Sequence, residues 1–135
     1  MKFPDDIRVF GDQNFRGVCP AEALEQATFF NRVRNAFPDT WGRLAIHNKN
    51  EGQRTMMQAA FDRTQGMVAG ASDIVIPARR TFVCEIKRRD HTKSSWQPGQ
   101  VEYLRAAKDA GAYACVALGV DAAWEALLEW SRLEA

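Results

Sequence analysis

The chain has 135 residues, of which 46% are hydrophobic and 26% charged, and its formal net charge is +1. This length suits one domain with a buried core, and this composition excludes a disordered chain. A net charge so close to zero provides no overall attraction to nucleic acid, although basic residues gather in one segment. The basic residues within 79–93 are Arg79, Arg80, Lys87, Arg88, Arg89 and Lys93, against Glu85 and Asp90 as the acidic ones.

The first predicted element is a turn-rich segment, residues 1–19, expected to be a weakly structured lead-in or an arm used for assembly. A first helix is expected from Pro20 to just before Pro38, because proline is tolerated in a first turn and ends a helix. Glu22 shares the apolar face of this helix, whereas Glu25 falls toward its edge. A charge in line with a core stripe indicates a role near the buried end of the sheet. The alternative is a solvated glutamate that favours the helix dipole.

A strand over Trp41–Asn48 and a second helix over Arg54–Gln65 are predicted next. His47, near the end of the strand, is either a ligand or a hydrogen-bonded structural residue. The apolar residues of the second helix recur at helical spacing, so we expect them to pack inward. The residues expected to do so are Met56, Met57, Ala60, Phe61 and Thr64.

Two short strands joined by a tight turn follow, Asp73–Ile76 and Thr81–Lys87. Successive strand side chains point to opposite faces, so Glu85 and Lys87 share one face. In an antiparallel hairpin, Asp73 at the outer end of the first strand lies near them. Two carboxylates and an ammonium at one edge of a sheet suit a hard divalent cation with an activated water.

The remaining elements are a third helix from Pro98 to about Ala110, a strand over Tyr113–Leu118 and a last helix capped by Asp121. Gln100 lies in the first turn of the third helix. The predicted order is α-β-α-β-β-α-β-α, an α/β fold whose main domain spans residues 20–135.

The cysteines exclude some kinds of site. Cys19, Cys84 and Cys115 are odd in number and form no Cys-x-x-Cys pair. We therefore expect reduced thiols in a cytoplasmic protein, not a disulfide framework. Neither a zinc nor an iron–sulfur site is expected, since the chain has only two histidines. We find no signal peptide or apolar run of membrane-spanning length and expect no membrane partner.

The hairpin residues meet the demands of phosphodiester hydrolysis. Asp73 and Glu85 repel each other unless a cation or a proton joins them. A bound Mg²⁺ would take oxygens from both, and the Ile86 carbonyl would be a third ligand. Lys87 would orient a metal-bound water and stabilise developing negative charge, while the flanking basic residues hold a polyanion. The same residues also allow a surface ion pair between Glu85 and Lys87 and a turn capped by Asp73.

Asp73 followed by Glu85-x-Lys87 resembles the signature of the PD-(D/E)XK nucleases, and its context is similar to their VRR-NUC branch. The similarity covers roughly residues 21–128. One departure is Ser72, where the family usually has proline. The motifs that carry the similarity are Glu22 to Gln26 before Phe29 and Phe30, Asn48 to Arg54, Gly70 to Asp73, Glu85 to Lys87, and Gln100 with Gly111.

The resemblance implies a restriction-endonuclease-like fold, with a central mixed sheet flanked by helices, and a metal-dependent DNA endonuclease. Asp73 and Glu85 would bind Mg²⁺ or Mn²⁺ together with the Ile86 carbonyl. Lys87 would position the attacking water or stabilise the pentavalent phosphorus. Glu22 would complete the site, directly or through a metal-bound water. The catalytic residues implied are Glu22, Asp73, Glu85, Lys87 and Gln100.

The implied partner is DNA, bound by a homodimer, because so short a chain has little surface to grip a duplex alone. Junctions, flaps or other branched DNA are favoured over sequence-specific restriction, and no small organic cofactor is expected. The resemblance also points to a bacterial or phage-encoded protein. The alternatives are a nuclease-fold DNA-binding or assembly module that no longer cuts, and an unrelated small α/β protein with a surface ion pair. The candidate phosphate contacts, each equally explained as solvated surface, are Arg54, Arg88, Arg89 and Lys93.

Overall fold

The computed structural model describes residues 1–48 and 55–134. These residues contain one five-stranded mixed sheet in the order β1-β5-β4-β3-β2. The central strand β4 pairs in parallel with β5 and antiparallel with β3. At the two edges, β1 is parallel to β5 and β2 is antiparallel to β3. The predicted α/β class with a central mixed sheet is confirmed. The strands are β1 (Arg8–Phe10), β2 (Ile46–His47), β3 (Ile74–Ile76), β4 (Phe82–Lys87) and β5 (Tyr113–Leu118).

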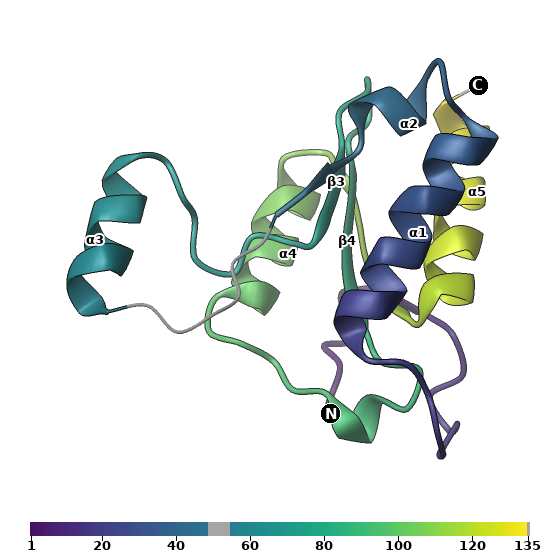
Figure 1. Ribbon diagram of the computed structural model, residues 1–135, viewed down its shortest axis with the longest axis horizontal. Coiled ribbons are helices and arrows are strands. Elements are labelled where there is room, and N and C mark those ends of the chain that lie inside the picture. Colours follow the sequence, from purple (N-terminus) through teal and green to yellow (C-terminus); the bar gives the residue numbers. More distant parts are fainter. Residues whose placement is uncertain (49–54, 135) are drawn as a thin grey trace.

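Helices cover both faces of this sheet. Helices α1 and α5 lie side by side on one face, and α4 lies on the other (Figure 1). Among the described residues, no helix has the length and apolar character needed to cross a membrane. The helices are α1 (Glu22–Ala36), α2 (Trp41–Leu44), α3 (Met56–Thr64), α4 (Gln100–Asp109) and α5 (Val120–Glu134), with a short 3₁₀ turn η1 (His91–Lys93).

The central strand β4 is buried along its whole length, because it has a neighbour on each side and helices on both faces. Its side chains alternate between two apolar clusters. Phe82, Cys84 and Ile86 belong to the cluster beneath α1 and α5. Val83 packs with Leu104 of α4 in the second cluster. The same alternation directs Glu85 and Lys87 to the α4 face, where they are buried charges.

Two segments differ from the predicted secondary structure. Residues 1–19 are not uniformly weakly structured, because Arg8–Phe10 forms the edge strand β1, in register with residues 115–117 of β5. The predicted strand over Trp41–Asn48 is helical in its first half, where Gly42 donates from its amide to the Phe37 carbonyl (2.8 Å). That turn packs against the end of α1, and only Ile46–His47 remains to pair with β3.

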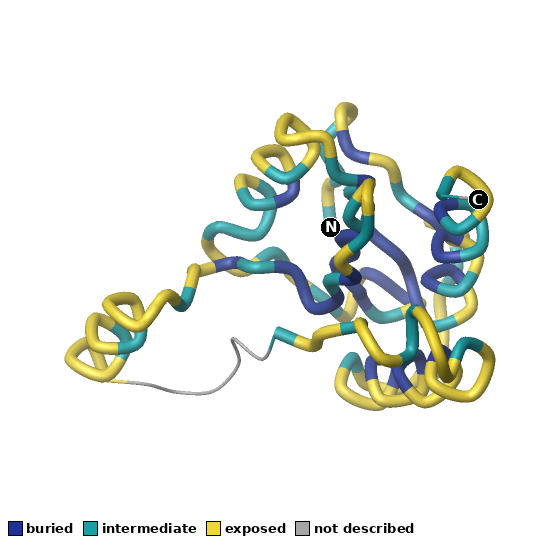
Figure 2. The backbone as a smooth tube through the Cα atoms, turned by 90° about the horizontal axis from the view of Figure 1, so that it is seen from above, coloured by how far each residue is buried: buried dark blue, intermediate teal, exposed yellow. Residues whose placement is uncertain are grey.

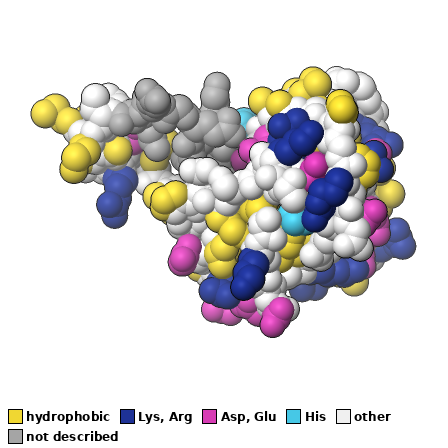
Figure 3. Space-filling view, turned by 90° about the horizontal axis from the view of Figure 1, so that it is seen from below, with side chains coloured by type: hydrophobic (Ala, Val, Ile, Leu, Met, Phe, Trp, Pro, Cys, Tyr) yellow, Lys and Arg dark blue, Asp and Glu magenta, His cyan; other side chains and the backbone are white. Residues whose placement is uncertain are grey.

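Helix α3 forms within the predicted range, but its expected inward packing is wrong. None of its residues is buried, and Met56, Met57 and Phe61 are 92%, 83% and 56% exposed. Figures 1 and 2 show α3 standing apart from the sheet and the other helices. Hydrophobic side chains are accordingly visible on this protruding end in the space-filling view (Figure 3). The apolar spacing in the sequence predicted the helix correctly, but not what its apolar face contacts.

The cap predicted for α5 is also wrong. The helix begins at Val120, so Asp121 lies in its first turn with an exposed side chain. The Val120 amide donates instead to the Glu25 carboxylate, which α1 brings from the other end of the chain. Glu25 therefore stabilises the start of α5.

Candidate active site

Asp73 is fixed at the point where the pairing of β3 with β4 stops. The last residue pair of the two strands is Ile74 with Cys84. Beyond it, the Ile86 amide has no strand partner from β3 and donates to Asp73 Oδ2 (3.0 Å). The Asp73 carbonyl accepts from the Asn48 amide (3.0 Å) and lies 3.1 Å from His47 Nδ1. His47 is thus a hydrogen-bonded structural residue that helps to place Asp73.

Gln100, the first residue of α4, links the two charged residues of β4. Its Oε1 accepts from Lys87 Nζ (2.9 Å), and its Nε2 donates to Glu85 Oε1 (2.9 Å). Lys87 Nζ also donates to the Ser95 carbonyl (2.9 Å) and lies 3.7 Å from Glu85 Oε1. The side-chain amide therefore fixes the lysine and the glutamate relative to each other.

Two glycines bring Gln100 to this position. Gly70, shortly before Asp73, and Gly99, just before α4, have φ angles of +79° and +88°. A Cβ atom on Gly70 would lie 2.2 Å from the Gly99 carbonyl carbon, so the two backbones touch at a distance that only glycine permits. The contact fixes the start of α4 against the loop that leads into β3.

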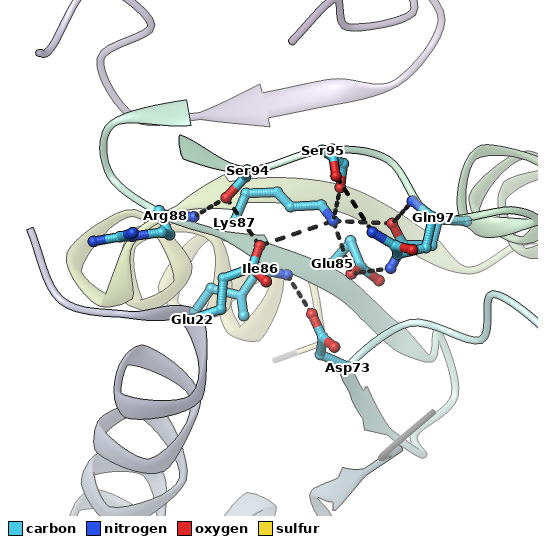
Figure 4. Close-up of polar contacts among 10 residues, drawn as sticks. Glu22, Asp73, Glu85, Ile86, Lys87, Arg88, Ser94, Ser95 and Gln97 are labelled. Atoms are coloured by element: carbon cyan, nitrogen blue, oxygen red, sulfur yellow. Dashed lines mark hydrogen bonds and ion pairs between the residues drawn. The ribbon is translucent and has the colours of Figure 1, made fainter. Parts of the chain in front are cut away.

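Glu22, the first residue of α1, reaches the same place from the opposite face of the sheet. Its Oε1 accepts from Ser94 Oγ (3.0 Å) and lies 3.9 Å from Lys87 Nζ (Figure 4). Glu25 is occupied at the start of α5, as described above. The structure therefore places Glu22, not Glu25, beside Lys87.

All five predicted catalytic residues line one cavity of about 530 Å³: Glu22, Asp73, Glu85, Lys87 and Gln100. Lys93, Ser94, Ser95 and Gln97 line it as well. The two serines and Gln97 are not among the predicted site residues, because they lie in a polar loop without a motif. The only signal for them was that this loop directly follows Lys87 in the chain.

Two carboxylates in this cavity, Asp73 and Glu85, are unusually buried. Burial raises the pKa of Asp73, and it raises the pKa of Glu85 well above the ordinary value, an effect that the neighbouring Asp73 charge increases. Glu85 Oε2 is buried and has no hydrogen-bond partner among the described residues. An orphaned carboxylate oxygen beside a second carboxylate fits a cation.

The donor set for such a cation is small. Within residues 1–48 and 55–134, no three His, Cys, Asp or Glu side chains cluster in a way that would hold a metal ion. Asp73 and Glu85 are two oxygen donors, and the Ile86 carbonyl is a third on the Asp73 side, because N–H and C=O of one strand residue point the same way. Mg²⁺ commonly takes few protein oxygens and keeps several waters, so this set suits it.

Three of the candidate phosphate contacts are engaged with the N-terminal segment. Arg88 donates to the Cys19 carbonyl (2.7 Å), and Lys93 Nζ donates to the Gly17 carbonyl (2.8 Å). The Arg89 guanidinium lies over the Phe15 ring, 3.9 Å from its centroid. The fourth candidate, Arg54, lies outside the described residues.

Comparison with solved structures agrees with this architecture. A structure described as a VRR_NUC domain protein matches with a TM-score of 0.70, covering 88% of this chain and 93% of that chain. The chain has the VRR-NUC fold. The sequence identity is 22%, so the likeness is one of fold, and it confirms the predicted resemblance at that level. No protein-family model and no curated protein matches the sequence.

Proposed function

We propose that this VRR-NUC-fold protein is a divalent-metal-dependent DNA endonuclease. The observation that carries the proposal is the buried Asp73–Glu85 pair, with an orphaned oxygen on Glu85, beside the Lys87 ammonium in an open cavity. A VRR-NUC fold with these residues in one cavity supports phosphodiester hydrolysis. The alternative, a surface ion pair between Glu85 and Lys87, is disfavoured because both side chains are buried.

Asp73, Glu85 and the Ile86 carbonyl would hold Mg²⁺ or Mn²⁺. A cation bound there supplies positive charge and a water of lowered pKa. The Gln100 amide donates to Glu85 and keeps that carboxylate turned toward the Asp73 side. Holding the carboxylates in advance removes the cost of ordering them when the cation and DNA arrive.

Lys87 stabilises the negative charge that develops on the phosphate. An ammonium has three N–H donors, and hydrogen bonds to the Ser95 carbonyl and to Gln100 Oε1 use two of them. The third is left for a phosphate oxygen or the attacking water. Glu22, within 3.9 Å of Lys87 Nζ, accepts a hydrogen bond from that water and orients it.

A homodimer that cuts branched DNA is the assembly we propose for this chemistry. The exposed Met56, Met57 and Phe61 of α3 support it, because a second copy would cover apolar side chains that the described part of one chain leaves in water. A nine-residue helix is also marginal in water without tertiary packing. Two sites in one symmetric particle would reach two strands of a junction or flap.

One assay tests the proposed function. Plasmid, linear and branched DNA are incubated with Mg²⁺, with Mn²⁺ or with EDTA, using wild type and Asp73→Ala. We expect cleavage with either metal, none in EDTA and none by the variant, with branched DNA cut fastest. Cleavage that survives EDTA, or that is unchanged in Asp73→Ala, contradicts the metal site. DNA binding without cutting would favour an inactive DNA-binding module.

A further inference from the structure

Arg88, in the loop that follows β4, donates side-chain hydrogen bonds to the backbone at the start of α1. The guanidinium donates from Nη2 to the Cys19 carbonyl (2.7 Å) and from Nε to the Pro20 carbonyl (3.1 Å). These carbonyls directly precede Ala21, the N-cap residue of α1, which offers no side-chain hydrogen bond. The start of α1 is therefore fixed by an arginine that directly follows β4 and not by a cap of its own.

Ser94 links the Arg88 backbone to the Glu22 side chain by hydrogen bonds. The Ser94 hydroxyl accepts from the Arg88 backbone amide (3.0 Å) and lies 3.0 Å from Glu22 Oε1. Since a hydroxyl has one proton and the amide needs an acceptor, the serine proton goes to the carboxylate. Arg88 thus holds the backbone before Glu22 with its side chain, and it orients the Glu22 carboxylate through Ser94 (Figure 4).

We propose that Arg88 and Ser94 are positioning residues that hold the Glu22 carboxylate beside Lys87. The proposal rests on the proposed nuclease function and reassigns Arg88, which the sequence offered as a phosphate contact. The Glu22 side chain is 34% exposed, so without Ser94 it would exchange between rotamers in water. Outer partners of this kind commonly change activity when removed, although they touch neither substrate nor metal.

Two serines supply a matched pair of variants. Ser94→Ala removes the hydrogen bond to Glu22. Ser131→Ala, the control, removes only a hydroxyl that donates to the Leu128 carbonyl (2.9 Å) within α5, and Ser131 does not line the cavity. We expect the single-turnover cleavage rate to fall about 10- to 100-fold in Ser94→Ala, with the Kd for DNA unchanged, and to recover in Ser94→Thr. Ser131→Ala should stay within about threefold of wild type.

A double-mutant cycle shows whether Ser94 acts through Glu22. Glu22→Gln keeps the size of the side chain and removes its charge. If Ser94 serves only to orient this carboxylate, adding Ser94→Ala to Glu22→Gln should cost less than about threefold more. If the loss of cleavage rate in the double variant equals the product of the losses in the two single variants, the positioning role is overturned.

The salt dependence of DNA binding separates the two roles of Arg88. A lost phosphate contact reduces the slope of log Kd against log salt by about 0.9. We expect Arg88→Ala to leave this slope unchanged while the cleavage rate falls. A smaller slope with an unchanged rate for bound DNA would restore Arg88 as a phosphate contact and overturn its positioning role.

Hydrogen exchange distinguishes failure of this proposal from failure of the proposed function. The Leu24 and Glu25 amides both donate to the Ala21 carbonyl (3.1 Å each) in the first turn of α1. We expect their exchange to rise roughly tenfold in Arg88→Ala and to stay unchanged in Ser131→Ala. If wild type cuts no DNA, the nuclease proposal fails, but faster exchange in Arg88→Ala still supports the claim that Arg88 holds the start of α1. Unchanged exchange in Arg88→Ala would overturn that claim, whether or not wild type cuts DNA.

Discussion

The buried end of β4 and the protruding helix α3 are opposite exceptions to the usual distribution of side chains, in which charged residues are exposed and large apolar residues are buried. Glu85 and Lys87 are charged residues that are 1% and 2% exposed. Met56 and Met57 are apolar residues that are 92% and 83% exposed. Charges are rarely buried unless they are paired, and contiguous exposed apolar side chains commonly mark a binding surface.

The two regions differ in whether the chain itself supplies partners for these side chains. At β4, Gln100, the Ser95 carbonyl and the Ile86 amide satisfy the buried charges from within the chain, apart from Glu85 Oε2. On α3, none of the apolar side chains is buried by the described residues. We therefore propose a small ion bound inside the chain for the first region, and a partner surface outside the chain for the second.

The largest expected effect is at Lys87. Lys87→Met keeps the apolar stem but removes the charge, and we expect cleavage to fall about 10²- to 10³-fold. Lys93→Met is the matched control, since Lys93 lines the same cavity but donates to the Gly17 carbonyl. Single-turnover rates on branched DNA give the comparison. Equal losses in the two variants would mean that the buried lysine has no special role.

The next largest effect concerns the backbone contact that positions Gln100. Gly66→Ala and Gly70→Ala both place alanine at a positive φ, which costs about 1–2 kcal/mol. A Cβ at Gly66 meets nothing within 4 Å, whereas one at Gly70 meets the Gly99 backbone at 2.2 Å. We expect Gly70→Ala to lower the free energy of unfolding by about 1–3 kcal/mol more than Gly66→Ala. Urea unfolding measures both, and equal losses would contradict the tight contact.

The partner role of α3 predicts a change of mass with little change of stability. Phe61→Ser should convert a dimer to a monomer in light scattering and change the monomer's free energy of unfolding by no more than about 0.5 kcal/mol. Leu133→Ser in α5 is the control, because Leu133 is exposed to a similar extent, 58% against 56% for Phe61. A wild-type monomer at high concentration would refute the dimer.

The smallest expected effect is a pH dependence of stability in metal-free protein. Burial and the Asp73 charge raise the folded-state pKa of Glu85 above its ordinary value of 4.5, so the folded chain keeps a proton that the unfolded chain releases. Stability is then fullest below this value and falls as pH rises through the folded pKa. In EDTA we expect Tm to fall by about 2–5 °C across this window.

Two comparisons check the origin of that pH dependence. Glu85→Gln should flatten the change of Tm with pH, because the glutamine does not titrate. Mg²⁺ should also flatten it, because the cation replaces the proton. A wild-type Tm that rises over the same window in EDTA would contradict the assignment.

Much of this architecture is readable from local patterns. The apolar run Tyr113–Leu118 coincides with β5, and strand alternation alone places Glu85 and Lys87 on one face. Strand β1 was missed because three residues are too few to show the alternation of a strand. Their conformation is decided by parallel pairing with β5, which is distant in the sequence. The inward packing of α3 was mispredicted because helical spacing shows that an apolar face exists but not what covers it.

The site was predictable as a set of residues but not as a geometry. Asp73 and Glu85 follow from the hairpin. The position of Gln100 depends on the contact of Gly70 with Gly99, and that of Glu22 depends on contacts from Arg88 and Ser94. Such contacts join segments far apart in the chain and leave no periodic trace in the sequence.

Binding of Mn²⁺ to the protein without DNA, measured by electron paramagnetic resonance, tests the metal centre itself. We predict one saturable Mn²⁺ site per chain in wild type, and loss of that site in Glu85→Gln, whose side chain keeps the size of the glutamate but not its charge. Equal Mn²⁺ binding by wild type and Glu85→Gln would contradict the claim that the buried carboxylates of the β3–β4 hairpin form a metal centre.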